Sequence, residues 1–523
     1  MKVLLIVPVQ GYEGKPQTFL SVTDFPVGFA YISASLKQAG HEVIGVNPNN
    51  KPQYDTAFHA LLHETTKAIK KHNPDLIGIG GLCVQFAFLK DAMTVIRKAT
   101  KSPIVLGGNI VSMDTEYIFN RLKPDYCIIG EGERAMVELA NGVERHCIKN
   151  LGYWEDGKAI LPQPDYNYGP IDDLPYPDYE PFDVQEMVDD YSMATRILYR
   201  YSRPYPRPFV ILSARGCPFS CTFCVHEGGP RYRARSVKAV MDEIKVMHEK
   251  YKFNILIFSD ELFAANKKRM RAMCEAIIEG KDKYGWDFDW MFQTHANSNL
   301  DEDTLRLAKE SGCYIFSYGI ESASNRVLES MNKKSTIEKV IKGIELAEKV
   351  GVGFSGNLLF GDPSENGEDI MASLEFWAEY GQSNQIFLTN LMPYPGSKLF
   401  DYCLERKIIE SRDAYYDTIG RVIYRMTSTS PEAWMEMMQL IRPLEQMWLF
   451  VKSTKGRLRV DPETNPILKA HFHGGSMWEI AADCPYCGRT SVYREMMVGK
   501  RGMVGTGCQY CHRRIKILID MIH

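Results

Sequence analysis

The sequence has no apolar run of the roughly 18 residues that a membrane-spanning helix needs. Its start, MKVLLIVPVQ, is apolar only briefly before Pro8 interrupts it, which is too short for the core of a secretory signal peptide. An excess of one charge is also lacking, because 62 Lys and Arg face 65 Asp and Glu, for a net charge of -3. We therefore expect a cytoplasmic protein without a membrane span and without nucleic acid as its main partner.

Cysteine, in contrast, is not scarce. Thirteen cysteines in a chain without an export signal point to metal ligands more than to disulfides. Seven of them fall into two groups with metal-like spacing, and the other six are scattered. The length of 523 residues, with 45% hydrophobic and 24% charged residues, predicts about three globular domains.

The first 150 residues alternate strand-like and helix-like segments. Residues 3–9 form an almost wholly apolar run, which is typical of a strand buried on both faces of a parallel sheet. Further strands are predicted over 41–46, 76–79, 104–106 and 126–129, and helices over 27–40, 56–71, 88–99, 115–122 and 134–139. This alternation predicts a doubly wound, Rossmann-like α/β domain that binds its ligand beyond the carboxyl ends of the strands.

Glycine is concentrated where three of these strands end. Gly80-Gly81, Gly107-Gly108-Asn109 and Gly130-Glu131-Gly132-Glu133 follow the third, fourth and fifth strands. Backbone without side chains allows a bulky flat ligand to come close. Each pair taken alone is explained equally well as a tight turn.

A loop with three cysteines opens the second half of the chain. Cys217, Cys221 and Cys224 have CxxxCxxC spacing and follow the apolar run 209–212. Three thiolates in one short loop can converge on one soft metal centre. Three cysteines would leave one iron of a [4Fe-4S] cluster free to bind a small molecule. The alternative is a structural zinc site with His226 as its fourth ligand.

Strand and helix patterns recur after this loop. Strands are predicted over 255–258, 289–294, 314–319, 353–359 and 385–391, and helices over 237–251, 267–279, 302–311, 336–350 and 369–380. With the strand before the cysteine loop this makes about six β/α units, fewer than the eight of a closed TIM barrel. We expect a partial (β/α)6 TIM barrel with a lateral opening.

The cysteine loop, with Phe223 just before its third cysteine, resembles the cluster loop of radical S-adenosylmethionine (SAM) enzymes. The segment VGFAYISASLKQAGHEV and the glycine-rich strand ends resemble the cobalamin-binding domain upstream of many such enzymes. The sequence is therefore similar, over about residues 1–400, to the cobalamin (B12)-dependent radical SAM family, and most of all to its class B methyltransferases.

This resemblance implies the cofactors and the reaction. The cofactors are a [4Fe-4S] cluster, SAM and cobalamin, and the partners are an unknown substrate and an electron donor such as flavodoxin or ferredoxin. One SAM would yield a 5'-deoxyadenosyl radical, and methylcobalamin would then methylate an unactivated carbon or a phosphorus. Ring closure or rearrangement without methyl transfer is an alternative, as is a corrinoid or metal sensor without turnover. The DxHxxG motif is missing, so cobalamin is expected without a lower histidine ligand.

The resemblance also implies site residues. The expected cluster ligands, which carry the catalysis, are Cys217, Cys221 and Cys224. The expected SAM-binding residues are Phe223, Ser259, Asp260, Glu261, Gln293, Tyr318, Glu321 and Ser322. The expected cobalamin-binding residues are Gln10, Gly11, Tyr12, Leu82, Cys83, Val84, Gln85, Gly107, Gly108, Asn109, Gly130, Glu131, Gly132 and Glu133. Arg215 and the arginines of 231–235 are candidates to hold anionic parts of SAM or substrate.

The C-terminal part contains a helical pattern and a second cysteine group. Apolar residues with helical spacing over 432–452 predict a helix that packs on the barrel. Two CxxC knuckles separated by twenty residues follow, made of Cys484, Cys487, Cys508 and Cys511. Four thiolates at this spacing predict a closed zinc site, with a rubredoxin-like iron or a second iron-sulfur cluster as alternatives.

The predicted domain organisation has five parts. They are a cobalamin-binding domain (1–150), a linker (151–205), a radical SAM domain (206–405), a helical region (406–482) and a zinc-ribbon-like segment (483–523).

Overall fold

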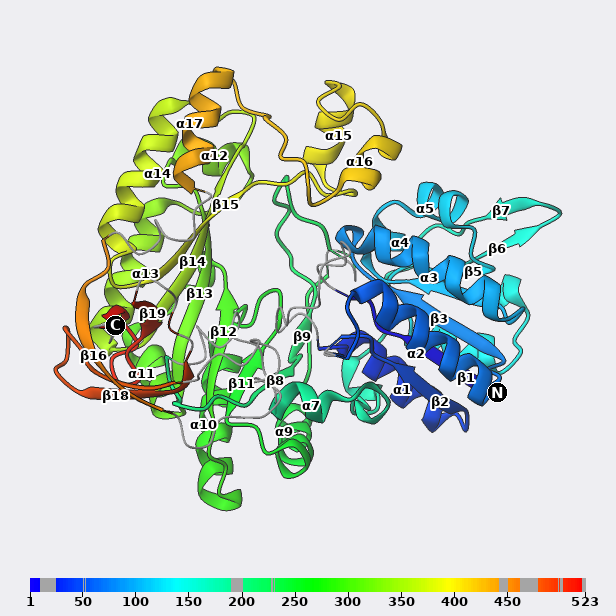
Figure 1. Ribbon diagram of the computed structural model, residues 1–523, viewed down its shortest axis with the longest axis horizontal. Helices are drawn as coiled ribbons and strands as arrows, with labels where there is room; N and C mark the ends of the chain where they lie inside the picture. Colours follow the sequence, from blue (N-terminus) through cyan, green and yellow to red (C-terminus); the bar gives the residue numbers. More distant parts are fainter. Residues whose placement is uncertain are drawn as a thin grey trace.

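The structure is a computed structural model that describes residues 1–9, 25–49, 51, 53–189, 201–226, 229, 231–441, 450–460, 478–496, 498 and 502–519. An N-terminal α/β domain lies beside a larger half-open barrel, and a small C-terminal sheet lies on the far side of that barrel (Figure 1). Among the described helices, none combines the length and apolar character needed to cross a membrane.

The N-terminal domain contains a seven-stranded sheet with the order β2-β1-β3-β4-β5-β6-β7. The first five strands are parallel, and they are β1 (Lys2–Ile6), β2 (Glu42–Val46), β3 (Leu76–Gly80), β4 (Ile104–Gly107) and β5 (Tyr126–Ile128). The order 2-1-3-4-5 is a common doubly wound order, with its switch point between β1 and β3. The predicted fold class of this domain is confirmed.

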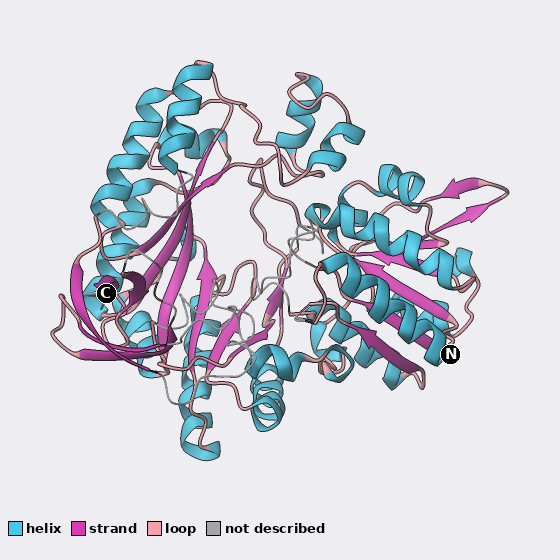
Figure 2. Cartoon of the chain, in the orientation of Figure 1, coloured by secondary structure: helices cyan, strands magenta, loops and turns pink. Residues whose placement is uncertain are grey.

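Helices cover both faces of this sheet (Figure 2). They are α1 (Val27–Gln38), α2 (Ala57–His72), α3 (Phe86–Ala99), α4 (Asn109–Met113), α5 (Thr115–Leu122) and α6 (Glu133–Ala140). Successive residues of β1 point to opposite faces, so Val3 and Leu5 join the core beneath α1 and α6, while Leu4 and Ile6 join the core beneath α2 and α3.

The sheet continues past the predicted boundary at residue 150. β6 (Leu151–Glu155) pairs antiparallel with β5, and β7 (Lys158–Ile160) pairs antiparallel with β6. Asp156 and Gly157 connect the last two strands with φ of 48° and 75°, which is typical of a type I′ hairpin turn. The linker therefore starts after Ile160, and the Asp-Gly pair was the signal for this hairpin that the sequence-based boundary missed.

The second domain contains a six-stranded parallel sheet whose spatial order β15-β14-β13-β12-β11-β8 follows the chain. Its strands are β8 (Pro208–Ile211), β11 (Ile255–Phe258), β12 (Asp289–Thr294), β13 (Cys313–Glu321), β14 (Gly353–Phe360) and β15 (Gln385–Asn390). The helices around it are α9 (Val237–Tyr251), α10 (Lys267–Tyr284), α11 (Glu302–Glu310), α12 (Asn325–Ser330), α13 (Ile337–Val350) and α14 (Gly367–Tyr380). The expected partial (β/α)6 barrel is confirmed.

Two sets of short elements connect the domains, one near the start of the barrel in the sequence and one after its last strand. The ribbon of β9 (Ala214–Arg215) and β10 (Arg233–Ala234) frames the cysteine loop. Helices α15 (Lys398–Glu405) and α16 (Arg412–Thr418) follow β15 and return to the N-terminal domain, where Tyr416 stacks on Tyr117 of α5. A short helix, α7 (Val184–Asp189), lies in the linker.

The C-terminal region contains both helix and strand. Helix α17 (Pro431–Ile441) buries Trp434, Met437, Met438 and Ile441, as the apolar spacing predicts, and residues 442–449 of the predicted helix lie outside the described residues. Within the predicted helical region 406–482, β16 (Ser453–Val460) and β17 (Trp478–Asp483) are strands. They form a five-stranded sheet with β18 (Thr490–Met496), β19 (Met503–Gly507) and β20 (Arg514–Leu518). A strand gains its stability from pairing and packing with other strands, which helical periodicity does not reveal.

Candidate active site between the two α/β domains

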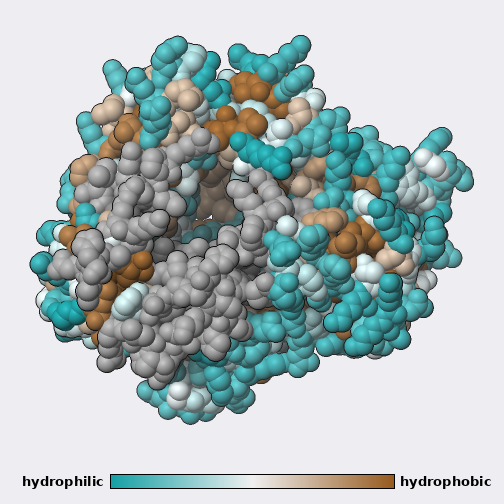
Figure 3. Space-filling view, in the orientation of Figure 1, coloured by the Kyte–Doolittle hydropathy of each residue, from teal (hydrophilic) through white to brown (hydrophobic). Residues whose placement is uncertain are grey.

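A cavity of about 760 Å³ lies where the carboxyl ends of the two sheets face each other. Its N-terminal wall includes the turns after β3, β4 and β5. Its other wall comes from the barrel, with Arg215, Gly216, Val225, Ser259 and Glu261. The space-filling view is hollowed near the middle of the molecule, between these two units (Figure 3). The position agrees with the rule that doubly wound sheets bind ligands at their carboxyl ends.

The predicted cobalamin cradle converges on this cavity. Every predicted cradle residue within the described ranges lines it, and these are Leu82, Cys83, Val84, Gln85, Gly107, Gly108, Asn109, Gly130, Glu131, Gly132 and Glu133. Gln10, Gly11 and Tyr12 lie outside the described residues.

The floor of the cradle is bare backbone. A Cβ added to Gly80 would lie 2.7 Å from the Gly107 carbonyl oxygen, and one added to Gly108 would lie 2.8 Å from the Gly81 nitrogen. Gly108 also has a φ of 84°, which other L residues rarely adopt. The ends of β3 and β4 therefore touch directly, and no side chain rises between them.

The side chains that project beside this floor are apolar and unusually exposed. Leu82 is 39% exposed and Val84 is 40% exposed, although both line the cavity. Gln85 does not project freely, because its Oε1 accepts a hydrogen bond of 2.8 Å from the Leu82 backbone nitrogen. A flat floor flanked by uncovered apolar side chains fits a large planar ring such as a corrin.

The geometry of the cysteine loop differs from that of a single-ion site. Cys217, Cys221 and Cys224 are half-buried or exposed free thiols. Among the described residues, three cysteine sulfurs within 4.8 Å of one another occur only in the C-terminal group, so these three are spread wider. Ligands of one tetrahedral ion, at about 2.3 Å from the metal, must lie within roughly 4 Å of one another. Wider spacing fits a cluster in which each cysteine binds a different iron.

His226 does not serve as a fourth ligand. Its Nδ1 is 2.8 Å from Oε2 of Glu261, and its Nε2 is 3.0 Å from the carbonyl oxygen of Phe219. Both ring nitrogens are therefore occupied within the loop and at the end of β11. The alternative of a zinc site made of three cysteines and this histidine does not fit the structure.

The segment after α12 fastens the cysteine loop. The Thr222 nitrogen donates to the Met331 carbonyl oxygen at 3.0 Å, and Asn332 Nδ2 lies 2.8 Å from both the carbonyl oxygen and Oγ of Ser220. The Thr222 carbonyl oxygen in turn accepts from the Leu399 nitrogen at 2.9 Å. The loop is thus held from two sides by elements that sequence reasoning did not connect to it.

Lys333 is a site residue that the sequence analysis missed. Its Nζ lies 2.6 Å from Oε1 of Glu321, and the two side chains are only 9% and 8% exposed. Burial lowers the pKa of Lys333, but the Glu321 carboxylate and the Cys221 thiolate outweigh it, so the pKa is raised overall. The side chain is therefore a buried cation beside the cysteine loop.

A break in strand β13 brings Glu321 into this position. The register with β14 shifts between Gly319 and Glu321, and Glu321 has a φ of 66°. A Cβ on Gly319 would lie 2.2 Å from Oε1 of Glu321 and 2.7 Å from Nζ of Lys333, so only glycine leaves room for the pair. A bulge that redirects a side chain is common beside active sites.

Two predicted SAM-binding residues point away from the cavity. Tyr318 is buried against α13, since a Cβ on Gly343 would lie 2.5 Å from its ring. Ser322 is fully buried, and its Oγ lies 3.4 Å from Oγ of Ser373 in α14. The alternation of strand side chains and the bulge turn both residues towards the helices, away from the cavity where they were expected.

The residues that end β11 and β12 have different surroundings. Ser259 and Glu261 line the cavity as predicted. Asp260 is fully buried and accepts hydrogen bonds from the nitrogen and Oγ of Ser213, at 2.6 and 2.5 Å, and burial raises its pKa to about 6. Gln293 donates to the Asp260 carbonyl oxygen at 3.0 Å. Asp260 therefore joins two strand ends and has no oxygen directed at a ligand in the cavity.

Phe223 is half-buried against the apolar core shared by the N-terminal domain and α15. It lies in the same loop as the three cysteines, so its contact holds the loop against that core.

An ionic cluster joins the cradle to the cysteine loop. Arg215 Nη2 lies 2.7 Å from Oε1 of Glu133, and its Nη1 lies 3.0 Å from Oε2 of Glu131. Arg233 also pairs with Glu131, and the Arg215 guanidinium lies over the Tyr31 ring. Arg215 was expected to bind an anion, but both carboxylates come from the opposite domain.

The comparisons with known proteins agree with this geometry. The Radical SAM superfamily model matches residues 211–376, and the B12 binding domain model matches residues 23–140. Together with methyltransferases among the relatives, these two matches support a cobalamin-dependent radical SAM methyltransferase. This cobalamin-dependent radical SAM enzyme uses a [4Fe-4S] cluster, SAM and cobalamin, and like radical SAM enzymes in general it needs an electron donor and a substrate.

Relatives and a solved structure extend this comparison. An uncharacterized methyltransferase of Pyrococcus horikoshii is 29% identical over 445 residues, which are 83% of this chain and 90% of that protein. An anaerobic magnesium-protoporphyrin IX monomethyl ester cyclase of Rubrivivax gelatinosus is 25% identical over 391 residues, 72% of this chain and 65% of that protein. The fold is shared with the radical SAM methyltransferase TsrM from Kitasatospora setae, with a TM-score of 0.60 at 18% identity over 77% of this chain and 75% of that chain.

The ionic cluster leads to a prediction about stability. Arg215→Met leaves Glu131 and Glu133 facing each other in a buried site, and we expect a loss of about 3 kcal/mol in the free energy of unfolding. Denaturant unfolding followed by circular dichroism measures it. Arg231→Met, an exposed arginine in the same loop, should cost almost nothing. The double variant Arg215→Met with Glu133→Gln should be more stable than Arg215→Met alone, and an equal or greater loss would contradict the pairing.

Lys333 leads to a prediction about the cluster. Lys333→Met removes a buried positive charge beside the cysteine loop, so the reduction potential of the bound cluster should fall, because added electrons are then less well compensated. A redox titration followed by electron paramagnetic resonance measures this potential. Lys334→Met, an exposed neighbour, is the matched control, and an unchanged potential in Lys333→Met would argue against this role.

Proposed function

We propose that the enzyme transfers a methyl group to an unactivated carbon, or to a phosphorus, of a substrate held in the cavity between its two domains. The observation that carries this proposal is that one cavity is lined both by the glycine floor of the N-terminal domain and by Gly216 and Val225, which flank the three cysteines. When bound there, the cofactors supply a 5'-deoxyadenosyl radical from SAM and a methyl group from methylcobalamin.

The residues of the N-terminal domain hold the corrin in this proposal. The bare backbone at Gly80, Gly81 and Gly108 allows the ring to lie flat, and Leu82 and Val84 cover its face with apolar surface. The absence of a DxHxxG motif remains the reason to expect cobalamin without a lower histidine ligand. We assign this role to a domain of residues 1–160.

The residues of the barrel hold SAM and the cluster. We assign Cys217, Cys221 and Cys224 as cluster ligands, and Ser259 and Glu261 as the wall that receives the methionine part of SAM, since both line the cavity. A carboxylate such as Glu261 suits the ammonium group of SAM. Glu321 is assigned to the same end of the site, where its pairing with Lys333 fixes its orientation.

The two domains position these groups relative to one another. Arg215 lies two residues before Cys217, and it is held by Glu131 and Glu133 from the turn that lines the cradle. The cavity lining is mostly apolar, so the substrate and the radical would react away from bulk water. For the electron donor we propose a flavodoxin or a ferredoxin.

Radical chemistry without methyl transfer is the second candidate. It is favoured by the resemblance to a cyclase, in which the named reaction is a ring closure. The two are separated by anaerobic incubation with SAM carrying a CD3 group, reductant and cobalamin. Methyl transfer requires S-adenosylhomocysteine and a labelled methyl corrinoid to form. Formation of 5'-deoxyadenosine without any labelled corrinoid would favour the cyclase type of reaction, and the absence of 5'-deoxyadenosine with cobalamin still bound would favour a sensor.

The cysteine loop supplies the prediction for this function. Cys221→Ala should reduce 5'-deoxyadenosine formation to background, because the two thiolates that remain are not enough to hold the cluster. Corrinoid binding in the N-terminal cradle should persist. Chromatography with mass detection measures the nucleoside, and visible absorbance measures the corrinoid. Cys147→Ala, an exposed cysteine outside both groups, should leave both measurements at wild-type values. Continued SAM cleavage by Cys221→Ala would refute the assignment of the loop.

A further inference from the structure

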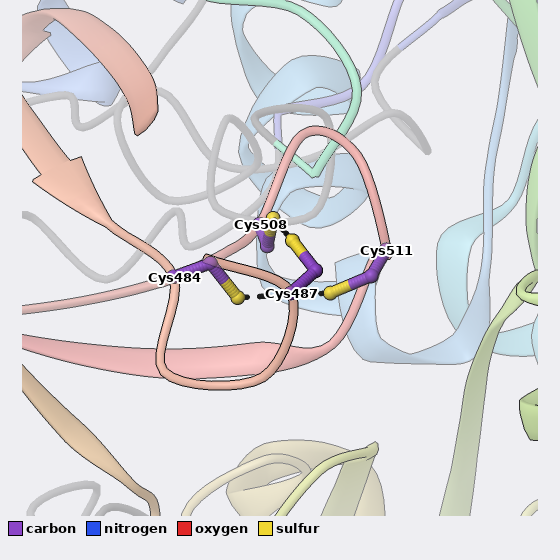
Figure 4. A group of neighbouring side chains, drawn as sticks. All are labelled: Cys484, Cys487, Cys508 and Cys511. Atoms are coloured by element: carbon purple, nitrogen blue, oxygen red, sulfur yellow. Dashed lines mark hydrogen bonds between the residues drawn. The ribbon is translucent and has the colours of Figure 1, made fainter. Parts of the chain in front are cut away.

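The second cysteine group is assembled by two matching turns. Cys484 and Cys487 lie in the turn between β17 and β18, and Cys508 and Cys511 lie in the turn between β19 and β20. The four side chains point towards a common centre (Figure 4). The Sγ atoms of Cys484 and Cys511 are 3.7 Å apart, as are those of Cys487 and Cys508, and all four lie within 4.8 Å of one another.

These distances fit one ion and exclude two other arrangements. Ligands about 2.3 Å from a tetrahedral ion lie a little under 4 Å from one another. The 3.7 Å separations are far longer than a disulfide bond of about 2 Å. The four sulfur atoms also lie closer together than the three cysteine sulfurs of the cluster loop, so a second polynuclear cluster does not fit.

The backbone prepares both turns to hold anionic sulfur. The Tyr486 nitrogen donates to Sγ of Cys484, and the Tyr510 nitrogen donates to Sγ of Cys508, each at 3.4 Å. Each turn then closes with the same bond, from Gly488 to the Cys484 carbonyl oxygen and from His512 to the Cys508 carbonyl oxygen, each at 2.9 Å. Hydrogen bonds of this kind stabilise a thiolate ligand and fix its direction.

The same turns dock on the end of the barrel that is remote from the active-site cavity. Tyr486 donates its hydroxyl to the Gln382 carbonyl oxygen at 3.1 Å. Arg514 donates its backbone nitrogen to the Ser383 carbonyl oxygen at 2.9 Å and Nη1 to the Gly381 carbonyl oxygen at 3.2 Å. Residues 381–383 form the turn that leads into β15, an edge strand of the open barrel.

A second contact reaches the start of β14. A Cβ on Gly353 would lie 2.9 Å from the Cβ of His512, so the strand begins directly beneath the knuckle. Nδ1 of His512 lies 2.6 Å from the Tyr201 carbonyl oxygen, and the Tyr201 hydroxyl donates to Gln385 of β15 at 2.7 Å. The knuckles therefore contact the amino-terminal ends of the last two barrel strands.

We infer that Cys484, Cys487, Cys508 and Cys511 bind one zinc ion, and that this ion braces the open edge of the barrel through the knuckles it closes. Four thiolates complete the shell and leave no open position, as in structural zinc sites. The site lies at the amino ends of the strands, whereas the cavity between the domains lies at their carboxyl ends, so the ion acts on stability. This inference does not depend on the proposed function.

Metal analysis and hydrogen exchange test the inference on the full-length protein. Plasma mass spectrometry should find one zinc per chain in the wild type and none at this site in Cys487→Ser. Amide exchange should then become faster in β14 and β15 but stay unchanged in β1, β3 and β4. Cys147→Ser, an exposed cysteine in the N-terminal domain, should keep both the zinc and the protection.

A milder variant separates the loss of one contact from general misfolding. Tyr486→Phe keeps all four ligands and should keep the zinc, yet exchange should become faster around residues 381–390 because the bond to Gln382 is lost. Iron in place of zinc in the wild type, or no metal there, overturns the inference. Loss of zinc in Cys487→Ser with unchanged protection of β14 and β15 overturns the bracing role.

Discussion

The ion pairs of Arg215 with Glu131 and Glu133 are the contact on which the architecture of the site depends. The arginine is 14% exposed and Glu133 is 8% exposed, so the charges are largely removed from water and must be matched to be tolerated. Because Arg215 precedes the cysteine loop and both glutamates line the glycine-rich wall of the cavity, the pairs set the relative position of the two walls. Neither domain contains both halves of this arrangement.

Charge compensation continues inside the barrel. Lys333 and Glu321 form a buried pair beside the cysteine loop, and Arg235 is paired with Glu243 behind it. Lys333 is a cation that interacts electrostatically with all three cysteines of the loop. Fixed positive charge therefore lies beside the cysteine loop, while mostly apolar surface lines the cavity.

Much of the fold was predictable because short sequence patterns identify its helices and strands. Helices α5 and α9 have the predicted bounds, since apolar periodicity and capping residues such as Ser236 define them within a short window. The parallel strands were predictable from their apolar runs. The β6–β7 hairpin was missed although its Asp156-Gly157 turn is a local signal. The C-terminal strands were not predicted, because strand identity depends on packing and pairing more than on a local pattern.

The position of the site was predictable from the sequence, but only some of its residues were. Glycines at strand ends and the cysteine spacing identified the cavity, because both are local signals of what lies at a sheet edge. The direction of a side chain was not predictable, since one bulge in β13 directs Glu321 inwards and leaves Tyr318 and Ser322 against helices. Lys333 was missed because it lies 12 residues beyond its partner, and no pattern links the two.

In a closed barrel the same strands form the site and leave no exposed edge. An open barrel has to meet these two requirements separately. Because β8 and β15 do not pair with each other, there is room beside the carboxyl ends for a second domain, but β15 is left as an edge strand. At the carboxyl end, α15 and α16 return to the N-terminal domain and cover the opening through stacking of Tyr416 on Tyr117. At the amino end, the cysteine knuckles provide the cover through the hydrogen bonds of Arg514 and Tyr486. The described elements beyond β15 therefore serve a barrel that stops at six strands, since each of its two ends needs its own cover.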